Sequence, residues 1–118
     1  MILQTESLAV YLAQEAIDMR KSINGLIVLV EAGFKLNPFS SALFVFSNRQ
    51  RDRVKILQWD FNGFWLHYKR LERGRFQWPD QNDGEVISLD RRQLGWLLDG
   101  LSIQQPKAHR RSSASIAG

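Results

Sequence analysis

The dipeptide Asn62-Gly63 separates two segments rich in apolar and aromatic residues, and it limits the fold of this chain more than any other feature. Residues 54–60 precede it and residues 64–71 follow it. Asn-Gly between two such segments is a strong hairpin signal, because both residues tolerate the left-handed backbone that tight hairpin turns require. The sequence therefore predicts an antiparallel β-hairpin over residues 54–71.

A turn that is symmetric about Asn62-Gly63 also predicts which residues share a face of this hairpin. Partners would have numbers that sum to 125, so that Trp59 faces Leu66 and Gln58 faces His67. One face is then interpreted as a core face whose far end turns basic, and Trp59, Phe61, Phe64 and Leu66 are its residues read as sheet core. The other face is mixed and can lie against solvent, a partner or a ligand. A slip of one residue would exchange the two faces.

Apolar patterns before the hairpin predict two strands and a helix. Residues 8–13 are apolar and fit a short strand, with a helix as the alternative. Residues 18–32 place apolar side chains at helical spacing, with Asp18 as the expected N-cap and Gly33 as the residue that closes the helix. Residues 43–46 are apolar on both faces, which favours a strand inside the sheet.

The patterns after the hairpin predict one more strand and a second helix. Residues 75–78 fit a short strand that ends at Pro79, and residues 88–99 fit a helix with Ser88 as its N-cap. The fold class expected is α+β: one domain with a twisted antiparallel sheet of about four strands and both helices packed on one face. Residues 1–105 would form this domain. Residues 106–118 are polar and small, and we expect a disordered basic tail.

Positive charge is concentrated in residues 48–79. This stretch holds eight of the sixteen Lys and Arg residues and three of the twelve acidic ones, so its net charge is 8 − 3 = +5 against +4 for the whole chain. Three of the four Trp residues lie in it as well. The hairpin would bring residues 49–55 and 69–75 to the same end, opposite the turn. Basic groups interleaved with aromatics are typical of a nucleic-acid interface, although a charge run is more often only a solvated face.

The candidate nucleic-acid contacts are the basic residues of this stretch, two basic residues at the expected start of the first helix, and two aromatics. The helix start favours anions, and an exposed indole ring can stack on a base. For Trp65 and Trp78 packing within the fold remains the alternative. The full set is Arg20, Lys21, Arg49, Arg51, Arg53, Lys55, Lys69, Arg70, Arg73, Arg75, Trp65 and Trp78.

The sequence offers no catalytic constellation. There is no cysteine, and the two histidines, His67 and His109, are far apart in the sequence. The carboxylates are scattered, and several of them fit caps or turns better than a metal site. No phosphate-binding glycine loop is present. We therefore expect no enzyme, cofactor or metal.

No signal peptide or membrane-length apolar run is seen, so a cytoplasmic protein without a membrane partner is expected.

Four segments of the chain resemble a known family. They read DMRKS, PFSSALFVF, RVKILQWD and YKRLERGRFQWP, at residues 18–22, 38–46, 53–60 and 68–79. The chain resembles the small accessory protein, commonly called TnpB or the second open reading frame product, of bacterial insertion sequences of the IS66 family. The likeness covers roughly residues 8–101. Ser22 and Phe61 depart from the family pattern, which usually has glycine at both positions, but neither change removes a charged residue.

The resemblance implies an accessory role in transposition, a form of DNA recombination, beside a separate and larger transposase. It implies no catalytic residues. Our leading hypothesis is a non-enzymatic protein that binds DNA at the element ends through the basic end of the hairpin. The alternative is a protein–protein adaptor that holds the transposase, or another protein of the element, and has no direct DNA contact. There the aromatic side chains would form the interface.

Overall fold

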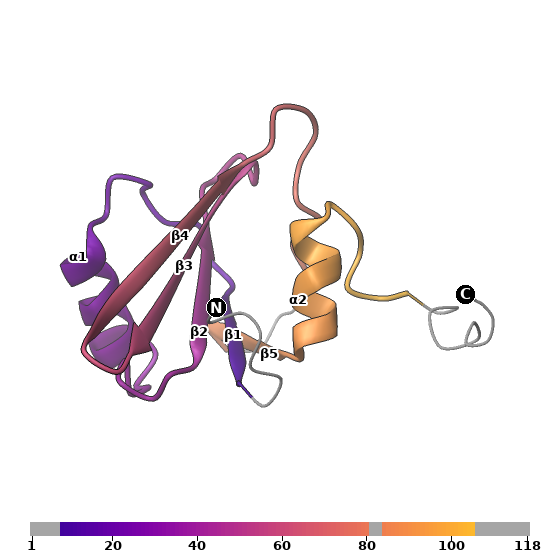
Figure 1. The fold of residues 1–118 in the computed structure, drawn as a ribbon. Helices are drawn as coiled ribbons and strands as arrows, with labels where there is room; N and C mark the ends of the chain where they lie inside the picture. Colours follow the sequence, from indigo (N-terminus) through magenta and orange to yellow (C-terminus); the bar gives the residue numbers. More distant parts are fainter. Residues whose placement is uncertain (1–7, 81–83, 106–118) are drawn as a thin grey trace.

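A central sheet carries one helix on each of its faces (Figure 1). The computed structural model describes residues 8–80 and 84–105. In these residues the five strands are β1 (Val10–Ala13), β2 (Leu43–Ser47), β3 (Arg53–Asp60), β4 (Gly63–Arg70) and β5 (Val86–Leu89). The helices are α1 (Ile23–Val28), which continues directly into the π-helical turn η2 (Leu29–Gly33), and α2 (Arg91–Leu98).

The strand order is β4-β3-β2-β1-β5, and the sheet is mixed. β1 and β2 run parallel, whereas the other neighbouring pairs are antiparallel. The expected α+β class is confirmed, but the expected sheet of about four antiparallel strands is not accurate. A parallel pair needs a crossover, and α1 with η2 supplies it between β1 and β2. Residues 75–78 form no strand, and Ser88 lies within β5 instead of capping a helix.

The two helices lie on opposite faces of the sheet, so the prediction that both pack on one face is wrong. Leu26 of α1 and Val30 of η2 pack with residues of one face, among them Phe44 of β2. Leu94 and Leu97 of α2 pack with residues of the other face. The reason lies in β2, in which every residue is buried. Successive side chains of a strand point to opposite faces, so a strand buried on both faces needs a cover on each side.

The helix starts differ from the predicted ones. The N-cap of α1 is Ser22, whose Oγ accepts a hydrogen bond from the Gly25 amide at 3.3 Å. Asp18 instead accepts hydrogen bonds from Arg20. The N-cap of α2 is Asp90, which exchanges side-chain and backbone hydrogen bonds with Gln93 in a capping box.

Gly33 closes η2 without a left-handed backbone. An added Cβ would lie 2.9 Å from Leu29 Cδ1, the end of a flexible side chain that can move aside. Gly33 therefore does not adopt the left-handed, helix-ending conformation that the sequence suggested.

The hairpin forms as predicted, but its register differs by two residues. The partners in β3 and β4 have numbers that sum to 123: Trp59 faces Phe64 and Gln58 faces Trp65. The loop is therefore Phe61-Asn62, and Phe61 takes a φ of 57°. Because a slip of two residues preserves the side-chain alternation, the predicted sets of residues on each face are retained. Phe61 is the exception to the predicted core, since it is 89% exposed at the hairpin tip.

Candidate nucleic-acid interface

The start of β3 and the end of β4 bring two guanidinium groups together. Arg53 and Arg70 are direct partners across the antiparallel pair and point to the α1 side of the sheet. The chain beyond β4 stays beside the 48–53 turn, because the Leu71 amide donates to the Asp52 carbonyl at 2.8 Å and the Phe76 amide to the Arg51 carbonyl at 2.7 Å. Residues 49–55 and 69–75 thus meet at one end of the sheet, at the top of Figure 1.

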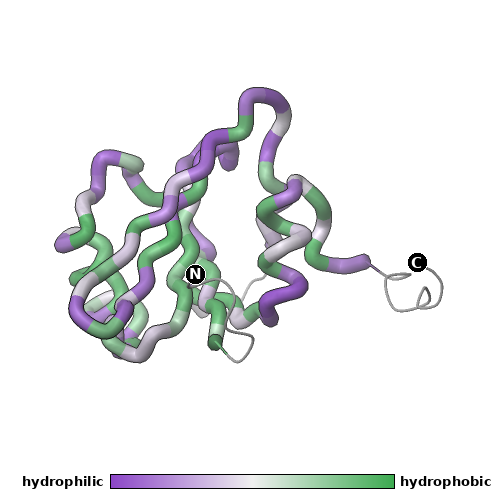
Figure 2. Tube along the Cα trace, in the orientation of Figure 1, coloured by the Kyte–Doolittle hydropathy of each residue, from purple (hydrophilic) through white to green (hydrophobic). Residues whose placement is uncertain are grey.

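Four arginines at this end are accessible to a ligand without breaking an ion pair. Arg53, Arg49, Arg73 and Arg75 are exposed, and no carboxylate oxygen of the described residues lies within 4.0 Å of them. Figure 2 shows the same end as largely hydrophilic, in the loop that follows β4. The arginines are thus arranged as a solvated positive surface, which we call the basic end: Arg49, Arg53, Arg70, Arg73 and Arg75.

The two ion pairs in the described part of the chain involve Arg70, which belongs to the basic end, and Arg20, which does not. Arg70 Nε donates to Glu72 Oε2 at 3.0 Å, and this hydrogen bond raises the pKa of Arg70. Arg20 Nη2 lies 2.7 Å from Asp18 Oδ2, and the hydrogen bonds from Arg20 hold the pKa of Asp18 far below its usual range. Both pairs are exposed, so each contributes little to stability.

The remaining nearby carboxylates have partners other than the arginines. Asp52 Oδ1 accepts a hydrogen bond from Asn48 Nδ2 at 2.6 Å. Asp60 Oδ2 accepts one from Trp65 Nε1 at 2.9 Å, at the opposite end of the hairpin. Within the described residues, the positive potential of the basic end is therefore reduced by direct carboxylate contact only at Arg70.

Two of the candidate residues are engaged inside the fold. Arg51 donates to Ser47 Oγ at 2.6 Å and to the Gln14 carbonyl at 3.1 Å, and its guanidinium lies 5.1 Å from the centre of the Trp78 ring. Trp78 Nε1 donates to the Ala13 carbonyl at 2.9 Å. Burial lowers the pKa of Arg51. Arg51 and Trp78 thus join the ends of β1 and β2 to the segment after β4, and their polar groups are hydrogen-bonded within the protein.

Both lysines of the hairpin bind backbone carbonyls. Lys55 Nζ donates to the carbonyls of Met19 and Lys21 at 2.6 and 3.1 Å, and so attaches the loop before α1 to the face that carries Arg53. This contact brings Arg20 and Lys21 towards the basic end. Lys69 points to the other face, where its Nζ donates to the carbonyl of Leu98 at the end of α2 at 2.7 Å.

Trp65 does not join the basic end. It lies on the α2 side of the sheet near the hairpin tip, and its ring stacks on that of His67 with the ring centres 6.0 Å apart. The ring is accessible all the same, since Trp65 is 52% exposed. A base stacked on Trp65 would therefore be separate from phosphates bound at Arg53 and Arg70.

A polar hollow of about 380 Å³ opens between the loop before α1 and the 48–53 turn. Arg49 and Arg53 line it, together with Asn48, Gln50 and residues 16–19. Residue types alone did not single out Gln50 or this hollow. The Arg53–Arg70 pair was also missed, because a symmetric turn about Asn62-Gly63 would pair Lys55 with Arg70.

Comparison with known proteins identifies the family of this chain. The sequence profile described as IS66 Orf2-like protein matches residues 8–108. This chain belongs to the IS66 Orf2-like family. IS66 Orf2-like proteins are accessory proteins of insertion sequences and are not known as catalytic. No cluster of three or more metal-binding side chains occurs in the described part of this family member.

Two relatives from Sinorhizobium fredii strain NGR234 extend along nearly the whole IS66 Orf2-like chain. The uncharacterized protein y4hO is 36% identical over 102 residues, which are 86% of this chain and 88% of the relative. The uncharacterized protein y4jC is 32% identical over 107 residues, 91% of each chain. No solved structure matches significantly. Within the described residues, no helix of this IS66 Orf2-like protein is long and apolar enough to span a membrane.

Proposed function

We propose that this protein is a non-enzymatic accessory factor of transposition that binds DNA through the phosphate backbone. The observation that carries the proposal is the Arg53–Arg70 pair. Like charges directly opposite each other in a sheet are destabilising. An anion bound between the two guanidinium groups relieves that repulsion, and this relief favours binding of the anion. The IS66 Orf2-like family supports the setting, since insertion sequences act on DNA.

The chemistry of the basic end favours phosphate over a carboxylate on a small ligand. Its arginines lie on two loops and two strand ends, and an extended anion can contact several of them at once. Arginine forks bind phosphate oxygens in a bidentate manner. Phosphate contacts position a protein without reading sequence, so the proposed contacts imply affinity for DNA and no base preference.

The proposed phosphate contacts are fewer than the basic residues of the chain. Arg49, Arg53, Arg70, Arg73 and Arg75 form the centre of the proposed surface, with Arg20 and Lys21 at its border. Arg51 and Trp78 take a structural role in this proposal, because their polar groups are bonded within the fold. Lys55 and Lys69 contribute charge at long range, while Trp65 offers a separate stacking position.

The test is a titration of labelled duplex DNA from an element end across a range of salt concentrations. A protein that contacts several phosphates shows a linear fall of log K with log salt, with a slope of about −0.9 for each phosphate neutralised. Charge reversal by Arg53→Glu with Arg73→Glu is expected to weaken binding and to reduce this slope by about one per lost contact.

The matched control is Lys35→Glu, which makes the same kind of charge change. Lys35 is exposed and does not line the hollow that contains Arg49 and Arg53. The control is expected to retain most of the salt slope of the unmodified protein. The control changes the net charge by two and the double arginine variant by four. A loss in the control about half that of the double variant would therefore mean that only net charge matters, and the assignment to the basic end would be wrong.

A protein–protein adaptor is the second candidate, and exposed aromatic side chains on β4 favour it. β4 is an edge strand, and it exposes Trp65 and Tyr68 on its two faces, with Phe61 at the adjoining tip. Open edges with apolar side chains are common docking sites for another chain. Absence of DNA binding at low salt, together with co-purification with the transposase that Trp65→Ala abolishes, would favour the adaptor.

A further inference from the structure

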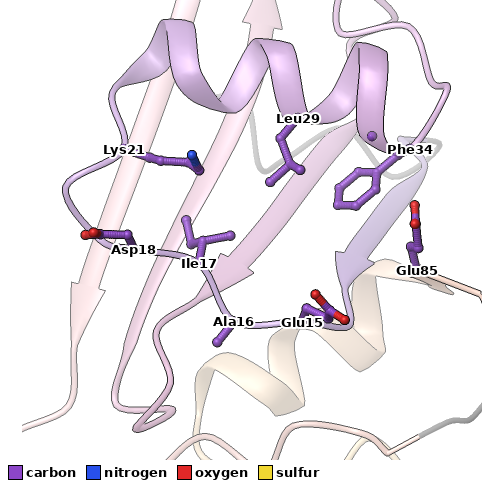
Figure 3. Close-up of a pocket in the computed structure, with 9 residues that line it drawn as sticks. Glu15, Ala16, Ile17, Asp18, Lys21, Leu29, Phe34 and Glu85 are labelled. Carbon is purple, nitrogen blue, oxygen red and sulfur yellow. The ribbon is translucent and has the colours of Figure 1, made fainter.

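A second hollow, distinct from the basic end, lies between η2 and the segment that follows β1 (Figure 3). Its volume is about 300 Å³, at the lower limit of the roughly 300–1,000 Å³ of small-ligand pockets. Ile17, Leu29 and Phe34 point into it in Figure 3 and form an apolar floor. The Phe34 ring is held in place by stacking on Phe46, with ring centres 6.2 Å apart.

The walls of this pocket are formed before any ligand arrives. The Ile17 amide donates to the Ser47 carbonyl at 2.8 Å, and the Gln14 amide donates to the Glu85 carbonyl at 2.9 Å. The opposite wall is η2, closed by a hydrogen bond from the Phe34 amide to the Leu29 carbonyl at 3.0 Å. Such π-helical turns are rare and are found frequently at functional sites.

The charges at the border of the pocket are separated. Glu15 and Glu85 lie at one end, beside Phe34, while Lys21 and Asp18 lie at the other (Figure 3). Both glutamates are exposed, and no basic group of the described residues lies within 4.0 Å of their carboxylates. Asp18 is already paired with Arg20. The end of the pocket near Phe34 therefore presents two carboxylates that have no countercharge among the described residues.

We propose that this pocket binds an arginine side chain of a protein partner. The methylene groups of that arginine would cover the apolar floor, and its guanidinium would meet Glu15 and Glu85 at the edge of the Phe34 ring. An apolar floor with two carboxylates at one end is complementary to a long side chain that ends in a cation. Arginine suits it better than lysine, because its planar group stacks on an aromatic ring and donates to two carboxylates at once.

The inference is independent of DNA binding, because the sign of the charge at Glu15 and Glu85 excludes a phosphate at this end of the pocket. It assigns the protein a second surface, for a basic protein segment, that lies beside the loop before α1. Residues 16–18 line both this pocket and the polar hollow of the basic end. A partner bound here would thus lie next to DNA bound at Arg49 and Arg53.

The test uses N-acetyl-arginine amide as the probe and N-acetyl-citrulline amide, its uncharged isostere, as the control. The probe is titrated into the ¹⁵N-labelled full chain while the amide signals are recorded by NMR. Saturable shifts at the amides of Ile17, Gly33 and Phe34 are expected with the arginine compound, with citrulline binding about tenfold more weakly. Shifts confined to other regions, equal binding of citrulline, or no shift up to the solubility limit would overturn the proposal.

Variants of the chain test whether Glu15 and Glu85, and not acidic residues in general, bind the arginine compound. Glu15→Gln with Glu85→Gln is expected to weaken binding of the arginine compound to the level of citrulline. Glu31→Gln removes an exposed carboxylate from η2 that does not line the pocket, and it should leave the affinity unchanged. Unchanged affinity in the double variant would refute the role of the glutamates. Pocket shifts that depend on protein concentration without probe would instead assign the pocket to a second copy of this chain.

Discussion

Arg53 and Arg70 lie directly opposite each other across β3 and β4, and only Arg70 has a carboxylate partner, Glu72. Two cations in opposite positions of a sheet weaken the pair, so the hairpin carries a cost at the end where the chain is most basic. Such a cost is expected where a charged surface serves an anionic ligand, since stability and function often conflict at binding sites.

This relationship predicts opposite effects of one substitution on stability and on DNA binding. Arg53→Gln should raise the free energy of unfolding by about 0.2–1 kcal/mol, because it removes the repulsion with Arg70. The same variant should bind DNA more weakly. Urea denaturation and the salt titration measure the two effects. Arg53→Lys, which keeps the charge but not the guanidinium fork, should leave stability unchanged and should weaken DNA binding less than Arg53→Gln. A less stable Arg53→Gln variant would contradict the prediction.

The hairpin tip offers a second prediction, because Phe61 has a φ of 57° and is almost fully exposed. A left-handed backbone costs a residue with a Cβ about 1–2 kcal/mol, whereas glycine adopts it freely. Phe61→Gly should therefore stabilise the protein by about 0.5–1 kcal/mol, once the larger entropy of the unfolded glycine chain is subtracted.

Thermal denaturation of Phe61→Gly and Phe61→Ala tests this explanation. The alanine variant removes the exposed ring but keeps the backbone conformation, so its melting temperature should remain close to that of the unmodified protein. If both variants are equally stabilised, removal of the exposed ring, and not relief of the backbone, is the cause.

Arg51 is expected to act as a structural residue. Its guanidinium bonds Ser47 and Gln14 and lies over Trp78, and a lysine ammonium cannot reproduce this arrangement. Arg51→Lys should lower the free energy of unfolding by about 1–3 kcal/mol while the net charge is unchanged. Chemical denaturation measures the loss. Under conditions in which Arg51→Lys remains folded, its DNA binding should show the same salt slope as that of the unmodified protein. A reduced slope would show that Arg51 contacts phosphate.

His67 predicts a dependence of stability on pH. Burial lowers its pKa, and its Nε2 has no hydrogen-bond partner among the described residues. The unfolded chain takes up the proton near pH 6.5, while the folded chain does so only at lower pH. Stability is therefore complete above about pH 6.5 and falls as the pH drops below that value.

Urea denaturation of the unmodified protein and of His67→Gln at about pH 7.5 and 5.5 measures this dependence. The variant should lose less stability over this interval. Asp18, whose pKa is lowered by Arg20, affects stability only below about pH 4 and does not interfere. Equal losses in both proteins would show that another group titrates in this range.

Several features followed from local patterns alone. The buried character of residues 43–46, the hairpin around residue 62 and the helical spacing after Ser22 were all readable in the sequence, because side-chain alternation and turn residues act over a few positions. The meeting of residues 49–55 and 69–75 followed from the hairpin as well, since any antiparallel pairing about this turn brings them to one end.

The sequence by itself determined that a basic hairpin end would exist, and its family likeness predicted the insertion-sequence setting that the comparisons support. The tertiary structure decided which arginines remain accessible. Arg51 and Arg53 are two positions apart, but one lies over Trp78 and the other faces Arg70. The tertiary structure likewise decided that the helices lie on opposite faces of the sheet. The physical reason is that contacts between distant segments, such as Trp78 with Ala13, depend on packing of the whole sheet and leave no mark in local spacing.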